Sequence, residues 1–270
     1  MNHCWDLRDI FIAACVESDQ EKVRGCLDIA GDLLNTPDRH GWSAFHYVSR
    51  HNKTDTLRTL MKQPGLDFNK VTLKYKTPLI LASIYGHHDI LRTLSGVRGL
   101  EVNYRGMKKY EWAALHYAVY YNDLECVKIL SQVPGVDINL RNYDGNTPLS
   151  LALKNNHVDI LRVLLAQPDL DLTVTDGNGL DVAHLVVGHH SGEALTCLEL
   201  LSRDKRVDWN IKNQDGDTPI MHCMKANKTE MIRILMNVEG VDIEGKYLDY
   251  VARWARIFTQ IMYVFISLKI

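Results

Sequence analysis

Residues 145–165 (GNTPLSLALKNNHVDILRVLL) contain two runs of hydrophobic positions with different patterns. Leu149, Ala152 and Leu153 follow an i, i+3, i+4 spacing, which places them on one face of a first helix. The second run leaves little of its helix polar, and it contains Val158, Ile160, Leu161, Val163, Leu164 and Leu165. A helix that is apolar over most of its circumference must be covered on more than one side. The segment therefore predicts a helix pair that cannot bury its apolar surface alone.

The residues around the first run indicate where its helix begins and ends. Thr147 can cap the helix through its hydroxyl, and Pro148 suits the first turn because the N–H that it lacks would have no partner there. The polar Asn155, Asn156 and His157 then separate the two runs. We expect a helix, a tight break and a second helix.

The same pattern returns five more times along the chain. The other copies are GWSAFHYVSRHNKTDTLRTLM (41–61), YKTPLILASIYGHHDILRTLS (75–95), EWAALHYAVYYNDLECVKILS (111–131), GDTPIMHCMKANKTEMIRILM (216–236) and a weaker copy, GLDVAHLVVGHHSGEALTCLELLS (179–202). Equivalent apolar positions lie 34 to 37 residues apart, at Phe45, Leu79, Leu115, Leu149, Ala183 and Ile220. A fixed period in this range indicates stacked supersecondary units.

A second phrase recurs between the copies. It reads PGLDFN (64–69), RGLEVN (98–103), PGVDIN (134–139) and KRVDWN (205–210), with the looser versions PDLDLT (168–173) and EGVDIE (239–244). Pro and Gly stop the second helix, and the alternating tripeptide that follows predicts a short extended segment. Each unit therefore predicts a turn, a helix, a tight break, a second helix and an extended loop.

The two ends of the chain depart from this pattern. Residues 5–36 predict two helices without the Thr-Pro start, so we expect residues 1–37 to be an atypical repeat that caps the stack. Near the other end, 12 residues from 257 to 268 carry no charge, which is too few for a membrane span of roughly 20. We expect residues 245–270 to form a capping helix or a degenerate repeat. The alternatives are a helix within 254–270 that docks on a membrane or a partner, and a chain end outside the native fold.

These residues resemble the ankyrin repeat family. The resemblance lies in Thr77-Pro78-Leu79, Thr147-Pro148-Leu149, Thr218-Pro219-Ile220, Gly86-His87, His157 and Asp137-Ile138-Asn139. It covers residues 38–244 in six copies, at about 38–71, 72–107, 108–141, 142–175, 176–212 and 213–244. No copy has the full Thr-Pro-Leu-His of the family, and the fifth copy lacks Thr-Pro. The resemblance implies an all-α solenoid of about seven helix-turn-helix repeats joined by β-hairpin-like loops, with His46 and His116 in structural hydrogen bonds to a neighbouring turn.

Composition narrows the function classes. The chain has 31 Lys and Arg against 33 Asp and Glu, so its formal charge of −2 argues against binding to nucleic acid or membranes driven by overall charge. With 46% hydrophobic and 24% charged residues, it is typical of a soluble globular protein. Asp6, Arg8 and Asp9 stand where a signal peptide would need its apolar run, so no secretory signal is visible, and the six cysteines form no C-x-x-C pair. We expect a monomeric intracellular protein, cytoplasmic or nuclear, with free thiols.

Catalytic chemistry has little support in the sequence. His87-His88 and His189-His190 have no carboxylate or thiol at a ligand spacing, so turn bonding is the preferred interpretation over a metal site. Asp215-Gly216-Asp217 resembles part of a calcium loop but lacks the closing Glu. There is no phosphate loop, nucleophile elbow or paired-carboxylate cleft. The sequence predicts a non-enzyme with no cofactor and no metal.

Ankyrin-like stacks usually hold partners on their hairpin tips and on the exposed side of each first helix. Carried over to this sequence, the resemblance implies a protein-binding surface of Arg39, His40, Trp42, Arg50, His51, Lys74, Lys76, Tyr85, Lys109, Trp112, Tyr120, Tyr121, Tyr143, Asp144, Asn146, Lys154, Asn155, Asp215 and Asp217. Solvent-facing tip residues are free to vary, whereas stacking residues must match their neighbours. We therefore expect a protein adaptor or scaffold.

Two features of this surface suggest different partners. Its middle is aromatic (Tyr85, Trp112, Tyr120 and Tyr121, with Tyr117 nearby), and aromatic residues commonly anchor protein interfaces. Alternatively, these tyrosines pack on the adjacent repeat. The early tips are cationic (Arg39, Lys74, Lys76, Lys108 and Lys109) and the later ones acidic (Asp144, Asp176, Asp215 and Asp217). The competing hypothesis is a binder of nucleic acid or another acidic ligand through the basic tips.

Overall fold

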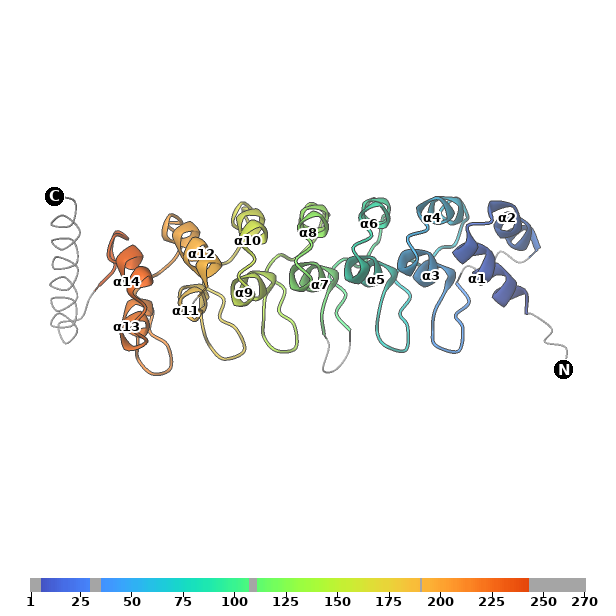
Figure 1. Cartoon of the computed structure of the whole chain (residues 1–270). Coiled ribbons are helices and arrows are strands. Elements are labelled where there is room, and N and C mark those ends of the chain that lie inside the picture. Colours follow the sequence, from blue (N-terminus) through green and yellow to red (C-terminus); the bar gives the residue numbers. More distant parts are fainter. Residues whose placement is uncertain (1–5, 30–34, 107–110, 190, 243–270) are drawn as a thin grey trace, which may run out of the picture. The chain divides into compact units, whose positions relative to one another are not determined.

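The computed structural model describes residues 6–29, 35–106, 111–189 and 191–242 of the chain (Figure 1). All regular secondary structure in these ranges is α-helical, as the sequence predicts. The residues divide into two compact units, Met1–Asp171 and Leu172–Ile270. The predicted C-terminal segment 245–270 and the predicted tip residues Lys108 and Lys109 lie outside the described residues.

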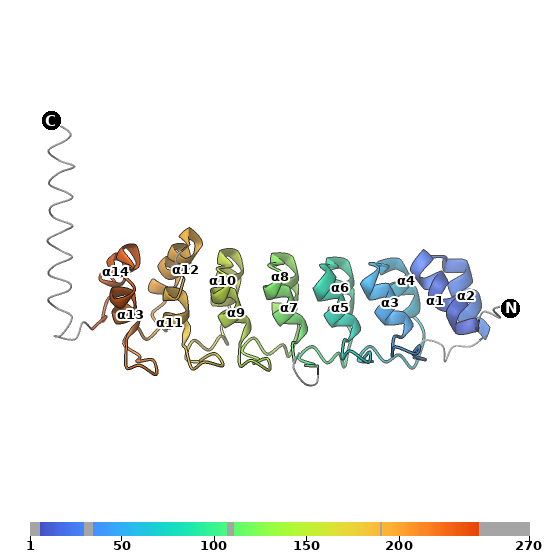
Figure 2. The same cartoon turned by 60° about the horizontal axis from the view of Figure 1, so that its bottom comes forward.

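The first unit is built from helix pairs arranged in two layers (Figures 1 and 2). Its helices are α1 (Leu7–Glu17), α2 (Gln20–Ile29), α3 (Ala44–Arg50), α4 (Thr54–Leu60), α5 (Pro78–Tyr85), α6 (His88–Ser95), α7 (Ala114–Tyr120), α8 (Leu124–Ser131), α9 (Pro148–Lys154) and α10 (Val158–Leu165). In the inner layer, α1, α3, α5, α7 and α9 each pack against the next. In the outer layer, α2, α4, α6, α8 and α10 do the same.

The second unit repeats this arrangement with four described helices. They are α11 (Val182–Val187), α12 (Gly192–Ser202), α13 (Pro219–Lys225) and α14 (Thr229–Leu235). Inner helix α11 packs on α13, and outer helix α12 packs on α14. The weak fifth copy of the sequence pattern therefore folds as a helix pair like the others. Within the described residues, no helix is long and apolar enough to cross a membrane.

Inner helices α5 and α9 are buried nearly all round. In α5 the six consecutive residues from Pro78 to Ser83 are buried, and the equivalent six positions of α9 are also buried. The core therefore includes the predicted apolar face of Leu149, Ala152 and Leu153. It also includes the residues between them, which the i, i+3, i+4 pattern did not predict to be buried. Because α7 lies against α5 on one side and α9 on the other, its apolar surface is covered by two neighbouring repeats.

The predicted helix starts are confirmed in two repeats. The Thr147 hydroxyl accepts a hydrogen bond from the backbone N–H of Ser150 at 3.1 Å, and Thr77 caps α5 in the same way through Ile80 at 3.2 Å. Pro148 and Pro78 occupy the first helical turns. The five described cysteines are buried and form no disulfide: Cys15, Cys26, Cys126, Cys197 and Cys223.

Where a repeat has His in place of Ile80 or Ser150, the imidazole bonds to the next repeat. His116 Nδ1 accepts the backbone N–H of Ala113 at 3.2 Å, so its Nε2 carries the proton and donates to the carbonyls of Leu140 (2.9 Å) and Asn146 (3.2 Å). His46 makes the equivalent bonds: its Nδ1 accepts the backbone N–H of Ser43, and its Nε2 donates to the carbonyls of Lys70 and Lys76, each at 3.0 Å. The structural hydrogen bonds that the resemblance implies are therefore present in both repeats.

The same imidazole position has the opposite electrostatics in the second unit. Burial lowers the pKa of His116 to about 4, and it lowers that of His46 to about 4 as well. At His184, burial also lowers the pKa, but the Asp181 carboxylate 2.8 Å from Nδ1 and the Asp217 carbonyl 2.8 Å from Nε2 outweigh it and raise the pKa. Replacing the Ser or Ala at the helix cap by Asp thus changes the charge state that the fold favours.

Asparagine side chains connect successive loops. Asn103 donates from Nδ2 to the Gly135 carbonyl at 2.7 Å and accepts the Asp137 N–H at Oδ1 at 2.8 Å. The same two bonds, to the repeat that follows, are made by Asn35, Asn69, Asn139 and Asn210. Four of these five asparagines end the recurring phrase in the sequence. Each amide therefore fixes the position of the next repeat's loop relative to its own.

We predict that Asn103→Ala lowers the free energy of unfolding by about 1–2 kcal/mol, because two backbone groups of the next repeat lose their partner at a site that water reaches. Asn155→Ala is the matched control, since the Asn155 amide bonds to Leu151 in its own helix. The control should cost under about 0.5 kcal/mol. Urea unfolding followed by circular dichroism measures both. Equal losses for the two variants would contradict a clamp between repeats.

We also predict that the stability conferred by neutral His116 is lost on acidification. The ordinary pKa of 6.5 falls to about 4 on folding, so between these values the unfolded chain binds more protons than the folded one. The contribution is therefore complete above pH 6.5 and declines as the pH falls toward 4. Between pH 7 and 5 the wild type should lose about 2 kcal/mol more than His116→Gln, which cannot titrate there. Parallel stability curves for the two proteins, measured by urea unfolding, would show that the imidazole is not held neutral.

Candidate functional site

One contact recurs at the edge of the inner layer, where a hairpin residue folds back on the end of the helix that follows it. The partner lies eight positions later in the sequence. The pair is Trp42 with Arg50, Trp112 with Tyr120, Asn146 with Lys154, and Asp217 with Lys225. The chemistry of each pair determines whether its residues stay available at the surface.

In the first full repeat the pair is aromatic and cationic. The Arg50 guanidinium lies 5.4 Å from the Trp42 ring centroid and 5.5 Å from that of Tyr85 in the next repeat. Tyr85 in turn stacks on His87, whose Nε2 donates to the Arg50 carbonyl at 2.8 Å. Arg50 and Tyr85 are both exposed, so the cation–π contact fixes their positions without covering them.

In the third full repeat the pair is aromatic on both sides. Trp112 meets Tyr120 edge-on with centroids 5.2 Å apart, and Tyr120 meets Tyr121 edge-on at 5.3 Å. Tyr120 is 50% exposed and Tyr121 53% exposed. About half of each tyrosine therefore faces solvent, and the other half is packed. They support one another from the same repeat.

Lys76 behaves differently from the other predicted tip cations. The residue eight positions later is Ile84, which offers it no polar partner. Lys76 Nζ lies 4.2 Å from the Tyr117 ring centroid and donates to the Tyr117 hydroxyl. Burial lowers the pKa of Lys76 to about 8. Its charge is thus engaged within the fold rather than presented at the tip.

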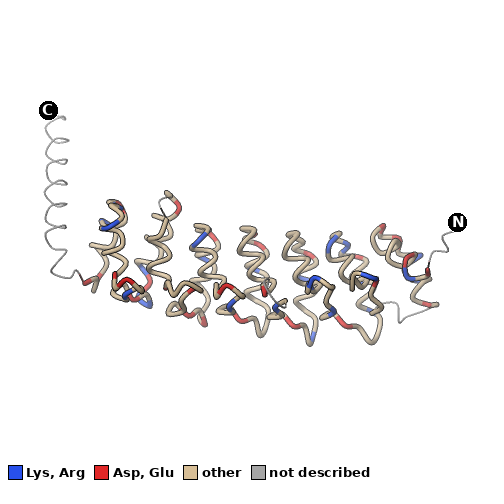
Figure 3. Tube along the Cα trace, turned by 90° about the horizontal axis from the view of Figure 1, so that it is seen from below, with Lys and Arg blue, Asp and Glu red and all other residues tan. Residues whose placement is uncertain are grey.

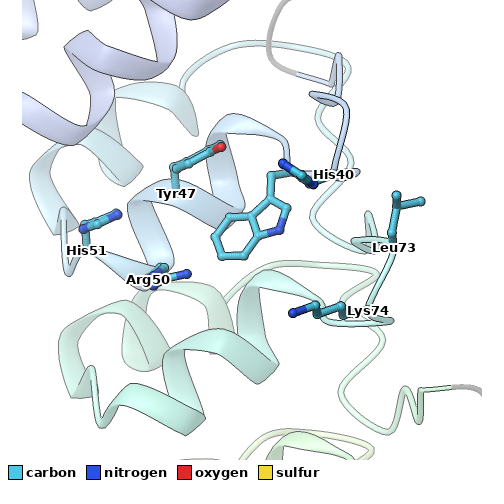
Figure 4. A pocket seen from close by; sticks show the side chains of 7 residues that line it. His40, Tyr47, Arg50, His51, Leu73 and Lys74 are labelled. Atoms are coloured by element: carbon cyan, nitrogen blue, oxygen red, sulfur yellow. The ribbon is translucent and has the colours of Figure 1, made fainter.

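A hollow of about 530 Å³ lies between the hairpins that precede α3 and α5 (Figure 4). It is lined by His40, Trp42, Tyr47, Arg50, His51, Leu73 and Lys74. The two hairpins are joined by the Leu73 N–H, which donates to the His40 carbonyl at 3.0 Å. A Cβ at Gly41 would lie 2.9 Å from the Leu73 nitrogen, so only glycine allows the hairpins to approach this closely.

Asp38 supports this hollow. Its carboxylate accepts the N–H groups of His40 and Trp42, each at 2.8 Å, and the Tyr47 hydroxyl at 2.7 Å. Burial raises the pKa of Asp38, but these three donors outweigh it and the net pKa lies below the ordinary value. The Tyr47 pKa rises to about 12 through burial and this bond. Sequence reasoning missed Asp38 and Tyr47.

A pattern in the sequence could have identified the role of Asp38. Side-chain oxygens at the equivalent positions of four other hairpins also accept the N–H four residues later. The residues that do so are Thr72, Asn142, Asp176 and Asn213. A polar acceptor at a fixed place in each period is therefore a signal of hairpin closure.

Three predicted tip residues do not face solvent. Asn146 is 8% exposed and Asp217 6% exposed, because each accepts the lysine of its pair, Lys154 at 2.6 Å and Lys225 at 2.5 Å. Asp176 is buried because it closes its hairpin. For these residues the expectation of an exposed tip was wrong. Exposure is as expected for Arg39, His40, Arg50, His51, Lys74, Tyr85, Tyr143, Asp144, Asn155 and Asp215.

The charges of the hairpins are mixed. In both units, Lys and Arg occur beside Asp and Glu along the loops (Figure 3). The cationic bias of the early tips is therefore confined to single side chains such as Arg39 and Lys74, both exposed. Among the described residues, the arrangement does not form a continuous basic stripe of the kind that follows a nucleic-acid backbone.

His88, Asp123 and Cys126 come together at the start of α8, with their ligand atoms within 4.8 Å of one another. Sequence reasoning found no ligand near His88, because Asp123 lies one repeat away. The bonds in place already account for the cluster: Asp123 accepts the Cys126 N–H at 2.9 Å and bonds His88 Nε2 at 3.0 Å. Burial and the neighbouring carboxylate raise the pKa of Cys126, which disfavours a thiolate ligand. The geometry is that of a helix cap.

Comparison with known proteins gives the same architecture. The ankyrin repeat domain of Bcl-3, a member of the IkappaB family, superposes with a TM-score of 0.74 at 23% identity, over 84% of this chain and 98% of that domain. SMC5-SMC6 complex localization factor protein 1 of Bos taurus is 39% identical over 101 residues, which are 37% of this chain and 9% of that protein. Target of rapamycin complex 2 subunit AVO2 of Saccharomyces cerevisiae is 28% identical over 191 residues, 70% of this chain and 41% of that protein.

The chain thus spans less than half the length of these two relatives. The family model for ankyrin repeats (3 copies) matches residues 10–106 and 101–176, which is more than half of the sequence. This match covers the helix pairs, the histidine bonds and the asparagine clamps of the first unit. The chain therefore belongs to the ankyrin repeat family.

Proposed function

We propose that this chain is a non-catalytic protein-binding module, an adaptor or scaffold, that holds its partner on the inner-helix ends and hairpin tips of the first unit. The observation that carries the proposal is the exposed aromatic group of the third full repeat. Trp112, Tyr120 and Tyr121 contact one another edge-on, and the two tyrosines keep half of their surface in solvent. Ankyrin repeats in general mediate protein–protein interactions.

The physical basis is pre-organisation. An aromatic ring buries a large area on binding and keeps a polar handle for a hydrogen bond. Rings that already support one another lose little conformational freedom when a partner covers them. In the first and third full repeats the recurring pair consists of such residues, whereas in the fourth and sixth it is a hydrogen-bonded lysine pair. The proposed interface therefore centres on the first three full repeats.

The relatives support a role of this class. By its name the yeast protein is a complex subunit, and by its name the bovine protein is a localization factor for a complex. Assembly with other proteins is the common element that we carry over to this chain. A cytoplasmic or nuclear location is part of the same proposal.

Binding of nucleic acid through basic tips is the second candidate. One cation of the predicted set, Lys76, lies on Tyr117 with its pKa lowered to about 8 by burial. The other exposed cations that the structure describes do not form a row, so few phosphates could be contacted together. A protein partner is the better fit to the aromatic surface.

We predict that Tyr120→Ala combined with Tyr121→Ala reduces capture of the main partner at least about tenfold, because interface aromatics typically contribute more than 1 kcal/mol each. The measurement is quantitative mass spectrometry of proteins retained by the immobilised chain. Thermal unfolding should change little, since both side chains are half exposed.

The matched control is Asp159→Ala combined with Arg162→Ala, which removes an exposed pair from the outer helix α10. This control should capture the partner like the wild type. If the tyrosine variant unfolds at markedly lower temperature, those residues belong to the core and the site is misplaced. If it folds and captures the partner fully, the aromatic surface is not the interface.

A further inference from the structure

The hollow between the first two hairpins combines an aromatic floor with positive charge. Trp42 is held in place from several sides: its backbone N–H donates to Asp38, and its ring packs on Tyr47 with centroids 5.1 Å apart. Arg50 covers part of the same ring. The indole therefore forms a fixed apolar surface rather than a mobile side chain.

Two cations and two imidazoles line the hollow. Arg50 and Lys74 line it together with His40 and His51, and none of its seven lining residues is acidic. Figure 4 shows Lys74 extending toward the middle of the hollow from the second hairpin and Arg50 approaching from the end of α3. Among the residues that the structure describes, neither Arg50 nor Lys74 forms an ion pair with a carboxylate.

Asp38, which bonds to three of the lining residues, does not neutralise these cations. Asp38 uses its carboxylate for the backbone of its own hairpin and for the Tyr47 hydroxyl. Burial together with the neighbouring Arg50, Lys53 and His87 lowers the pKa of His51, which is the expected effect of a positive field at this end of α3. The hollow thus attracts an anionic group that the chain itself does not supply.

We propose that this hollow binds an acidic peptide segment of the protein partner, with an aliphatic or aromatic side chain against Trp42 and an adjacent Asp or Glu carboxylate between Arg50 and Lys74. Its volume of about 530 Å³ falls in the range typical of ligand pockets, ~300–1,000 Å³. The Arg50 guanidinium contacts the rings of both Trp42 and Tyr85, at 5.4 and 5.5 Å from their centroids, so it is pre-organised to bind a carboxylate.

Protein rather than nucleic acid is the occupant because the positive charge is local. Nucleic-acid binding gains its strength from many phosphate contacts along a backbone. This hollow offers two cations beside an apolar floor, on a chain whose formal charge is −2. One carboxylate next to one apolar side chain matches that arrangement. The inference rests on the proposed function and names the chemistry of one part of the partner.

The test is selection from a phage-displayed library of random peptides with the full chain as bait. The wild type should enrich peptides that place Asp or Glu beside Phe, Leu or Trp. Arg50→Glu combined with Lys74→Glu should lose this enrichment, and synthetic versions of the selected peptides should bind the double variant at least about tenfold more weakly by fluorescence anisotropy.

The matched control is Lys128→Glu combined with Arg162→Glu, which makes the same change of charge on the exposed side of the outer helices α8 and α10. It should bind the selected peptides like the wild type. Lys74→Glu alone serves as a second variant, because Lys74 is exposed and its replacement leaves the fold intact. Thermal unfolding of each variant establishes that it is folded.

Three results would overturn the proposal: no enrichment of acidic residues, equal peptide binding by the hollow and control variants, or displacement of the peptides by a single-stranded oligonucleotide at lower concentration than by free peptide. If any of these occurs while Tyr120 and Tyr121 remain necessary for partner capture, the proposed function stands without the acidic segment. If acidic peptides bind the hollow but the tyrosines prove dispensable for capture, the proposed interface fails instead.

Discussion

Inner helices α3, α5 and α7 are each covered by the inner helices of two neighbouring repeats, and the rest of the fold follows from that packing. A helix such as α5, with six consecutive buried residues, has no stable arrangement in isolation. The outer helices lie over it, and the hairpins must lie at a fixed height for the layers to match. His46 and His116 set that height from one side of the repeat, and the asparagine amides set it from the other. Residues that make these contacts have no freedom left for recognition.

We therefore propose that recognition uses the end of each inner helix and the hairpin that folds back on it. The same position is used in two ways. Where the pair is Asn146 with Lys154 or Asp217 with Lys225, polar groups satisfy each other and the hairpin residue is buried. Where the hairpin residue is Trp42 or Trp112, the ring orders its partner but leaves surface exposed. This difference explains why the aromatic and cationic surface belongs to the early repeats.

The fold could be predicted in detail because its information is local and repeated. The period, the Thr-Pro starts and the apolar faces identified the helices, and the caps at Thr77 and Thr147 are as expected. The weak copy at 179–202 was harder, since Asp181 replaces the usual cap and reverses the charge preference of His184. The asparagines recur at the same position of the sequence pattern, but their role as clamps depends on contacts with a loop one repeat away.

The candidate site was predicted less well because exposure depends on pairing across eight residues. Sequence position alone cannot show that Lys154 donates a hydrogen bond to the Asn146 side chain. Nor can it show that Lys76 turns toward Tyr117 because Ile84 gives it no partner. The cluster of His88 with Asp123 was missed for the same reason: its members are one period apart. Contacts between repeats become predictable only when positions are compared at the period.

The most direct test of this account is site-specific photo-crosslinking. p-Benzoylphenylalanine replaces Tyr121 on the inner-helix end in one protein and Arg162 on the outer helix α10 in another, and each is irradiated in an extract of cells that express the chain. The account predicts a discrete crosslinked protein partner from position 121 and background labelling from position 162. The same partner crosslinked from position 162, with none from position 121, would place recognition on the outer layer and contradict the account.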